Sequence, residues 1–223
     1  MHRENDLEKE YQQALRDGAD ELEIQVSAEV IEQMSVHYTL LRRWASRINL
    51  TSIVEPKPAA EIHGLDCLLF AEFFSADSSE SVSDIGSGAG FPGIVLALAR
   101  PSLSLTLVEP LRKRVSFLKT CLATLKRGDV QVKQEKLLPT KRPPWTVDTI
   151  VSRATLAPER LVELAGPYLN PGGRLLTTSG ENAHTLSDFE NLAQAAGFES
   201  VHRRTWKLPG GETRILDECC FAG

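Results

Sequence analysis

A glycine-rich turn near the middle of the chain limits the possible fold more than any other feature. Gly86, Gly88 and Gly90 alternate within five positions of the stretch DIGSGAGFPG. A strand-like run, residues 82–85, precedes them, and a helical run, residues 92–100, follows. A backbone needs this much glycine where it bends sharply or where another group must approach it closely. Strand, glycine turn and helix together predict the first unit of a nucleotide-binding α/β fold.

The rest of the chain continues this alternation of strand-like and helical runs, which predicts a mainly parallel sheet with helices on both faces. Two last strand-like runs have no helix between them and meet at LPGG, so they predict an antiparallel hairpin. The fold class is therefore a Rossmann-like α/β domain with seven strands. The expected strands are 82–85, 104–109, 130–134, 147–152, 173–178, 198–206 and 212–221, and the expected helices are 92–100, 112–126, 158–169 and 183–196.

The first 75 residues predict a helical extension that packs on the main domain, residues 82–223, across the polar linker SADSSES. Residues 1–25 are expected to be a loosely attached helical arm. A stripe of apolar residues at steps of three and four predicts an amphipathic helix over residues 28–48, with Ser27 as its N-cap. A second helix is expected over residues 58–74.

The composition predicts a cytoplasmic protein that binds no metal and crosses no membrane. The 223 residues carry a net charge of −5, with 25 basic and 30 acidic residues. Residues 1–23 alone hold eight acids and three bases, so the remainder is neutral on average and can still carry a basic face. The four cysteines form neither a C-x-x-C pair nor a Cys/His metal spacing. A monomer is expected.

Asp84 before the turn separates two classes of cofactor. The pattern D-x-G-x-G-x-G is used by S-adenosylmethionine-dependent methyltransferases, whereas the dinucleotide pattern G-x-G-x-x-G would need glycine at Phe91. Asp84 is expected to reach the cofactor's ammonium group. Glu109, at the end of the second strand, is expected to accept hydrogen bonds from ribose hydroxyls, which both classes use. The terminal hairpin favours the methyltransferase, and a dehydrogenase is the alternative.

Arg153, in a Ser-Arg-Ala stretch after the fourth strand, is the catalytic candidate because this stretch has a cation and no general base. Methylation of an exocyclic amine uses an Asn/Asp-Pro-Pro-aromatic loop after that strand, but Pro143-Pro144-Trp145 precedes it. Methylation of pyrimidine C5 needs a cysteine nucleophile, and no cysteine lies in the loop after strand four or after strand five. A ring nitrogen such as guanine N7 needs only alignment and charge stabilisation.

Several motifs together resemble the bacterial guanine-N7 methyltransferases of 16S ribosomal RNA, also called glucose-inhibited division protein B. The resemblance covers nearly the whole chain from about residue 30. The matching stretches are Asn49-Leu50-Thr51, His63 to Leu68 (HGLDCL, with Cys67 for the family's serine), Asp84 to Gly93, Leu107 to Leu118 (LVEPLRKRVSFL), Val151 to Ala154 (VSRA), Gly172-Gly173-Arg174 and Gly211 to Arg214 (GETR).

The resemblance implies S-adenosylmethionine as cofactor, bound at Gly86, Gly88, Gly90 and Phe91, with Glu109 on the ribose. It implies adenine contacts near Lys136 and Leu137, where the family usually has an acid, and it places Arg153 beside the cofactor and the incoming base. The implied partner is 16S ribosomal RNA in the small subunit or its assembly intermediate. The family's lysine before Gly180 is Ser179 here, and its basic C-terminus is absent. A methyltransferase with another substrate and a non-catalytic cofactor- or ribosome-binding protein therefore remain alternatives.

Overall fold

A computed structural model describes residues 2–139, 143–153, 156–180 and 185–223, and a seven-stranded sheet forms its centre. The strand order is β3-β2-β1-β4-β5-β7-β6. β1 to β5 run parallel, and β7 lies antiparallel between β5 and β6. The Rossmann-like class and the terminal hairpin are thereby confirmed. The strands are β1 Ser81–Ile85, β2 Ser104–Val108, β3 Gln131–Lys133, β4 Val147–Arg153, β5 Leu169–Gly180, β6 Phe198–Lys207 and β7 Thr213–Phe221.

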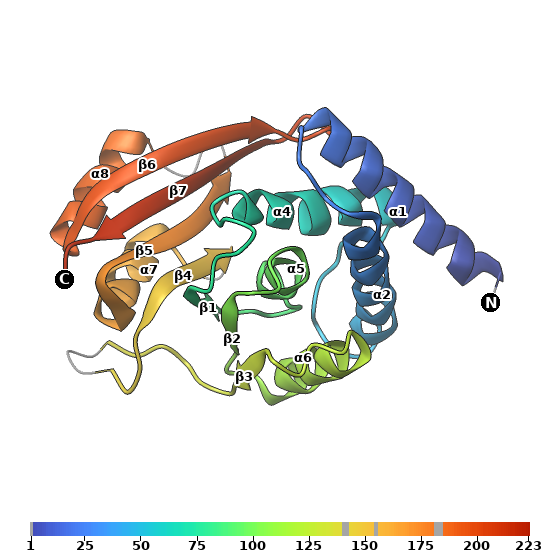
Figure 1. Ribbon diagram of the computed structural model, residues 1–223, viewed down its shortest axis with the longest axis horizontal. Coiled ribbons are helices and arrows are strands. Elements are labelled where there is room, and N and C mark those ends of the chain that lie inside the picture. Colours follow the sequence, from blue (N-terminus) through green and yellow to red (C-terminus); the bar gives the residue numbers. More distant parts are fainter. Residues whose placement is uncertain (1, 140–142, 154–155, 181–184) are drawn as a thin grey trace.

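Helices cover both faces of the sheet (Figure 1). Neighbouring strand residues point to opposite faces. Leu107, Val151 and Leu176 accordingly join the core formed with α1 to α6, whereas Ile150 and Leu175 join the core formed with α7 and α8. The helical elements are α1 His2–Glu21, α2 Ala28–Ala45, α3 Pro56–Ala59, the π-helix η1 Ala60–Leu65, α4 Asp66–Ala71, α5 Gly93–Ala99, α6 Arg112–Thr124, α7 Pro158–Ala165, the 3₁₀-helix η2 Gly166–Tyr168 and α8 Leu186–Ala195.

The prediction of a loosely attached N-terminal arm is wrong. Tyr11, Leu15 and Ala19 are at most 2% exposed in α1, and their spacing of four places them on one helix face. The Tyr11 ring stacks on Tyr38 of α2, with ring centres 4.2 Å apart. This apolar stripe anchors α1 to the helices beside the sheet (Figure 1).

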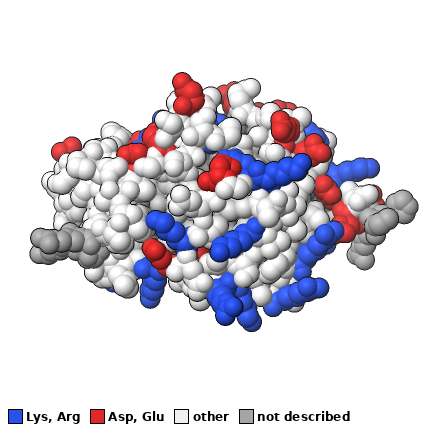
Figure 2. Space-filling view, turned by 60° about the horizontal axis from the view of Figure 1, so that its bottom comes forward, with Lys and Arg blue, Asp and Glu red and all other residues white. Residues whose placement is uncertain are grey.

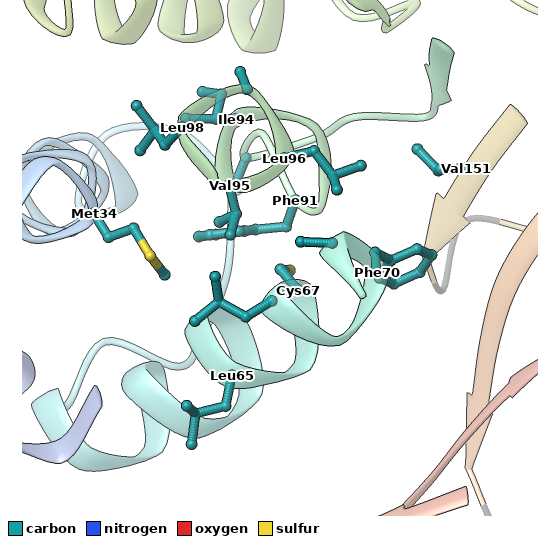
Figure 3. Packing of buried hydrophobic residues seen from close by; sticks show 14 of the residues in the cluster. Met34, Leu65, Cys67, Phe70, Phe91, Ile94, Val95, Leu96, Leu98 and Val151 are labelled. Atoms are coloured by element: carbon teal, nitrogen blue, oxygen red, sulfur yellow. The ribbon is translucent and has the colours of Figure 1, made fainter. Parts of the chain in front are cut away.

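The buried helix α5 links the N-terminal helices to the sheet. It carries only small and apolar side chains, GIVLALA, and six of its seven residues are buried. Figure 3 shows its residues between Met34 of α2 and Cys67 and Phe70 of α4. The same core extends from α1 to β7, so it crosses the expected boundary at residues 75–82. The division into two domains stays a prediction.

The helix predicted over residues 58–74 is interrupted by a π-helix, Ala60–Leu65. In an α-helix the Asp66 amide would bond to the carbonyl of Ile62, four residues earlier. Here it donates to Glu61 O, five residues earlier, and to Gly64 O. π-Helical turns are rare and occur frequently at functional sites.

The boundary predicted between residues 169 and 173 is also wrong. The helix expected to reach residue 169 ends at Ala165, and β5 begins at Leu169 rather than at Gly173. Leu169 pairs with Val147 of β4. The segment between Leu169 and Arg174 forms an irregularity in the register with β4, and Gly172 has a φ of 75° there. Ser27 caps α2 as predicted, its side chain accepting from the Val30 amide.

Candidate functional site

The glycine turn after β1 requires its glycines. Gly86, Gly88 and Gly90 have φ values of 73°, 57° and 87°, in the region that L side chains rarely adopt. A Cβ placed on Gly88 would meet no protein atom nearer than 3.7 Å. The turn therefore presents bare backbone with space beside it, as the approach of a ligand requires.

Asp84 lies beneath this turn and is completely buried. Its Oδ2 accepts a hydrogen bond from the Gly93 amide at 3.1 Å. Its Oδ1 is buried without a hydrogen-bond partner among the described residues. Burial raises the pKa of Asp84 from 3.8 to about 7, although hydrogen bonds from Ser87 and Gly93 oppose the rise. The site therefore contains a carboxyl group with unused acceptor capacity.

Glu109, directly after β2, holds the turn in place. Its two carboxylate oxygens accept from the backbone amides of Gly88 at 2.9 Å and of Leu111 at 2.8 Å. Only 1% of the residue is exposed. The sequence predicted a ligand contact for Glu109 but not this bond across to the glycine turn. The contact with ribose stays a prediction.

Two cavities meet at Gly86. The first, here called the polar cavity, has a volume of about 290 Å³. It is lined by residues that include Thr51, His63, Gly86, Gly88, Phe91 and Arg153. The second, here called the apolar cavity, has a volume of about 380 Å³, and its lining includes Val108, Lys136, Leu137, Leu138, Leu156 and Leu164. Both lie at the carboxyl ends of parallel strands, where α/β folds bind ligands.

The predicted site residues divide between these places. Gly86, Gly88, Phe91 and Arg153 line the polar cavity. Lys136 and Leu137 line the apolar cavity, the first exposed and the second buried. Asp84, Gly90 and Glu109 form or hold the glycine turn. None of the three is among the described residues that line either cavity.

Arg153 is the last residue of β4, so the prediction that it follows the fourth strand is wrong. Its Nη1 donates to Ile62 O and to Asp66 Oδ2, the latter at 3.1 Å. Its Nη2 lies 3.2 Å from His63 Nδ1, and its guanidinium carbon lies 5.4 Å from the centre of the Phe91 ring. The side chain is 14% exposed. Ala154, the next residue of the predicted motif, lies outside the described residues.

His63 comes from the π-helix and is fixed in one tautomer. Arginine only donates, so His63 Nδ1 accepts from Arg153, and Nε2 carries the proton toward Thr51 Oγ1 at 3.0 Å. Burial and the Arg153 charge lower the pKa of His63 from 6.5 to about 3. The ring stacks on Phe91, with centres 4.8 Å apart. His63 is therefore neutral, with both nitrogens engaged, and provides no general base.

Arg114 fixes another wall of the polar cavity. It lies on α6, and its Nε and Nη2 donate to Asn49 O at 3.3 and 3.1 Å. This bond ties the Asn49-Leu50-Thr51 stretch to the sheet domain. Asn49 and Arg114 both lie in stretches that resemble family motifs. The sequence contained no signal that they contact each other, because they are 65 positions apart.

Within the described part of the chain, no group of three or more His, Cys, Asp or Glu side chains could hold a metal ion. No helix in that same part has the length and apolar character needed to span a bilayer.

Known proteins resemble this chain in sequence and in fold. The family model of GidB, rRNA small subunit methyltransferase G, matches residues 30–212. A "Ribosomal RNA small subunit methyltransferase G" of Alkaliphilus oremlandii is 33% identical over 90% of this chain and 85% of its own. A protein of that name from an Anaeromyxobacter species is 33% identical over 91% of this chain and 94% of its own.

Among solved structures, a methyltransferase from Pyrococcus furiosus has a TM-score of 0.59 at 16% identity, covering 84% of this chain and 97% of its own. The YcgJ protein from Bacillus subtilis also has a TM-score of 0.59, at 15% identity, covering 72% of this chain and 100% of its own. At such low identity these two structures support the fold alone.

Proposed function

Because the chain belongs to the rRNA small subunit methyltransferase G family, we propose that it transfers a methyl group from S-adenosylmethionine to N7 of a guanine in 16S ribosomal RNA. The observation that carries the proposal is the polar cavity, where the glycine turn, Phe91 and Arg153 meet around a space whose described lining residues provide no general base. A dehydrogenase, the alternative left open by the sequence, is excluded by the family. The proposed substrate places the reaction in the cytoplasm.

The described residues fit S-adenosylmethionine. The space beside Gly88 admits a group in close contact with the backbone, and the free acceptor capacity of Asp84 suits an ammonium group. The leucines of the apolar cavity suit an adenine ring, with Lys136 and Leu137 at its edge. Glu109 would hold the ribose while it keeps the turn in place. When bound, the cofactor supplies an electrophilic methyl group.

The acceptor chemistry follows from the described side chains that line the polar cavity. Guanine N7 has a free lone pair at neutral pH, so the reaction needs orientation and no proton removal. His63 cannot take a proton, because both its nitrogens are engaged and its pKa is about 3. Phe91 presents an aromatic ring to the cavity, and Arg153 provides hydrogen-bond donors beside it. Their role is to bind and orient the base.

The charge distribution suits an RNA partner. Figure 2 shows Lys and Arg side chains dominating the lower half of one face of the molecule. Arg112, Lys113 and Lys119 on α6 are exposed, and Arg114 of the same helix lines the polar cavity. Phosphate neutralisation by such side chains dominates RNA affinity. Not every cation is available: Arg203 is bound to buried Asp217 at 2.7 Å.

The test is transfer of labelled methyl groups from S-adenosylmethionine to small ribosomal subunits that lack the modification, followed by nucleoside analysis. We expect the label in 7-methylguanosine. Gly88→Leu would fill the space beside the turn and should abolish transfer. Gly172→Leu is the matched control, because Gly172 also has a positive φ, 75°, and open space around it, but lies at an exposed position of β5.

Two results would refute the proposal in different ways. Label in another nucleoside would disprove N7 as the acceptor atom. Binding of S-adenosylmethionine with no transfer to any ribosomal RNA would disprove the RNA substrate and favour the alternatives of another acceptor or a non-catalytic role.

A further inference from the structure

Asp66 brings together two arginines that come from different strands. Its Oδ2 accepts from Nη1 of Arg153 at the end of β4. Its Oδ1 lies 3.1 Å from Nε of Arg214 in β7, close enough for an ion pair although not in hydrogen-bond geometry. The Asp66 side chain is 2% exposed, and the two arginine side chains are 14% and 15% exposed. One buried carboxylate therefore faces two half-buried cations.

The π-helix creates this arrangement. Because the Asp66 amide bonds to Glu61 O, the carbonyl of Ile62 is available to Arg153. Ile62 O, His63 Nδ1 and Asp66 Oδ2 then form three acceptors for one guanidinium, all within five residues of chain. Such a fork fixes the plane of the guanidinium. The arrangement holds Arg153 against Phe91 at the wall of the polar cavity.

Asp66 supplies the negative charge that faces both arginines of this cluster. Arg153 and Arg214 contribute two permanent positive charges. Asp66 and Glu212 contribute two carboxylates, but Glu212 is 59% exposed and bonds only the outer side of Arg214, at 3.1 Å. Removing one partner of a buried ion pair is costly, and replacing Asp66 takes a negative charge from the position beside the Arg153 guanidinium.

We propose that Asp66 is a positioning residue that balances the charge of Arg153, so that the polar cavity accepts a cationic sulfonium ligand. The inference rests on the proposed function, because S-adenosylmethionine carries this cation. The product of methyl transfer, S-adenosylhomocysteine, has the same amino acid and nucleoside groups but a neutral sulfur. Removing the negative charge of Asp66 should weaken binding of the first ligand and leave the second almost unaffected.

The size of the effect follows from the size of the cavity. A sphere of 290 Å³ is about 8 Å across, and Asp66 lies behind Arg153, 3.1 Å from its Nη1, so a ligand sulfur in the cavity lies within roughly 15 Å of the Asp66 charge. One unit charge at about 15 Å and an effective dielectric constant of about 20 gives about 1.1 kcal/mol, which is about sixfold in affinity. Asp66→Asn should therefore lower the preference for S-adenosylmethionine over S-adenosylhomocysteine by a factor of about six or more.

The test is calorimetric titration of the full-length protein and its variants with each ligand. Asp217→Asn is the matched control, because Asp217 is also completely buried and paired with an arginine, Arg203, outside the polar cavity. It should alter stability while leaving the ratio of the two dissociation constants unchanged. Arg153→Gln, which removes the positive charge and keeps Asp66, should change the ratio in the opposite direction to Asp66→Asn.

An equal change for both ligands in Asp66→Asn would mean that Asp66 has only a structural role, and would overturn the inference. If Asp66→Asn does not fold, Arg153→Gln decides, since an unchanged ratio there overturns it as well. Failure of the wild-type protein to bind either ligand would instead disprove the proposed cofactor.

Discussion

Asp84→Asn should stabilise the protein at neutral and alkaline pH, although it alters the predicted cofactor site. The wild-type carboxyl is completely buried and receives only one backbone hydrogen bond, from Gly93, on Oδ2. An asparagine can keep that bond through its carbonyl oxygen. Its amide then takes the place of Oδ1, which has no hydrogen-bond partner among the described residues. The substitution thus replaces a buried anion by a neutral group of the same shape.

The pKa of Asp84 sets the size and sign of the effect. The pKa rises from 3.8 to about 7 in the folded protein, mainly through burial. Between these values the folded state holds a proton that the unfolded state has lost, so wild-type stability falls as pH rises and levels off above pH 7. At about 1.4 kcal/mol per pH unit, the upper limit of the penalty is about 4 kcal/mol. From pH 5 to pH 8 the advantage of the variant should grow by about 3 kcal/mol.

Urea unfolding of both proteins at pH 5, 6, 7 and 8 measures this advantage directly. Asp148→Asn provides the control of opposite sign. Hydrogen bonds from Ser81, with a further one from Asn170, lower the pKa of Asp148 below 3.8. Its stabilising contribution is lost only as pH falls below about 4, so this control should be less stable by a constant amount from pH 5 to pH 8. An Asp84→Asn advantage that is absent, or that does not grow with pH, would refute the reasoning.

Three further substitutions test separate parts of the structure. Arg153→Ala should slow methyl transfer and also lower the free energy of unfolding by about 3 kcal/mol, because it takes a buried partner from Asp66; a loss of transfer without a loss of stability in urea would contradict the ion pair. Glu109→Gln should lower stability by about 1–3 kcal/mol, since its amide would face a backbone N–H; an unchanged melting temperature would show that the turn needs no such anchor. Tyr11→Ala should cost about 3 kcal/mol in urea unfolding, whereas a loosely attached α1 would show no change.

The sequence predicted those parts of the fold that depend on local patterns. Alternation of strands and helices, the glycine turn and the hairpin all follow from residues near one another in the chain. Where tertiary pairing overrode local preference, the prediction was wrong. Leu169 begins a strand because it pairs with Val147, in spite of the proline and glycines that follow. α1 packs closely because its stripe of Tyr11, Leu15 and Ala19 finds a partner surface that no local rule describes.

The candidate site shows the same limit at the level of single side chains. The sequence singled out Arg153 and Glu109 by residue type and position, but it assigned both to a ligand alone. In the structure Arg153 is fixed by groups 87 to 91 positions away, and Glu109 by an amide 21 positions away. The fold brings these partners together. A single sequence therefore shows them only as separate motifs and does not show which residues contact one another.

The polar cavity is lined partly by a widely shared fold and partly by residues in the motifs of this family. The fold is similar to solved structures at only 15–16% identity, so it is compatible with many sequences. Leu50, Thr51 and His63 line the cavity from the N-terminal helical part, and they lie in the stretches that distinguish the family resemblance. A nucleophile that needs no base makes few chemical demands on the protein, and its selection depends on shape and hydrogen bonding. We therefore expect the wall formed by the N-terminal part to select the acceptor, while the sheet binds the methyl donor.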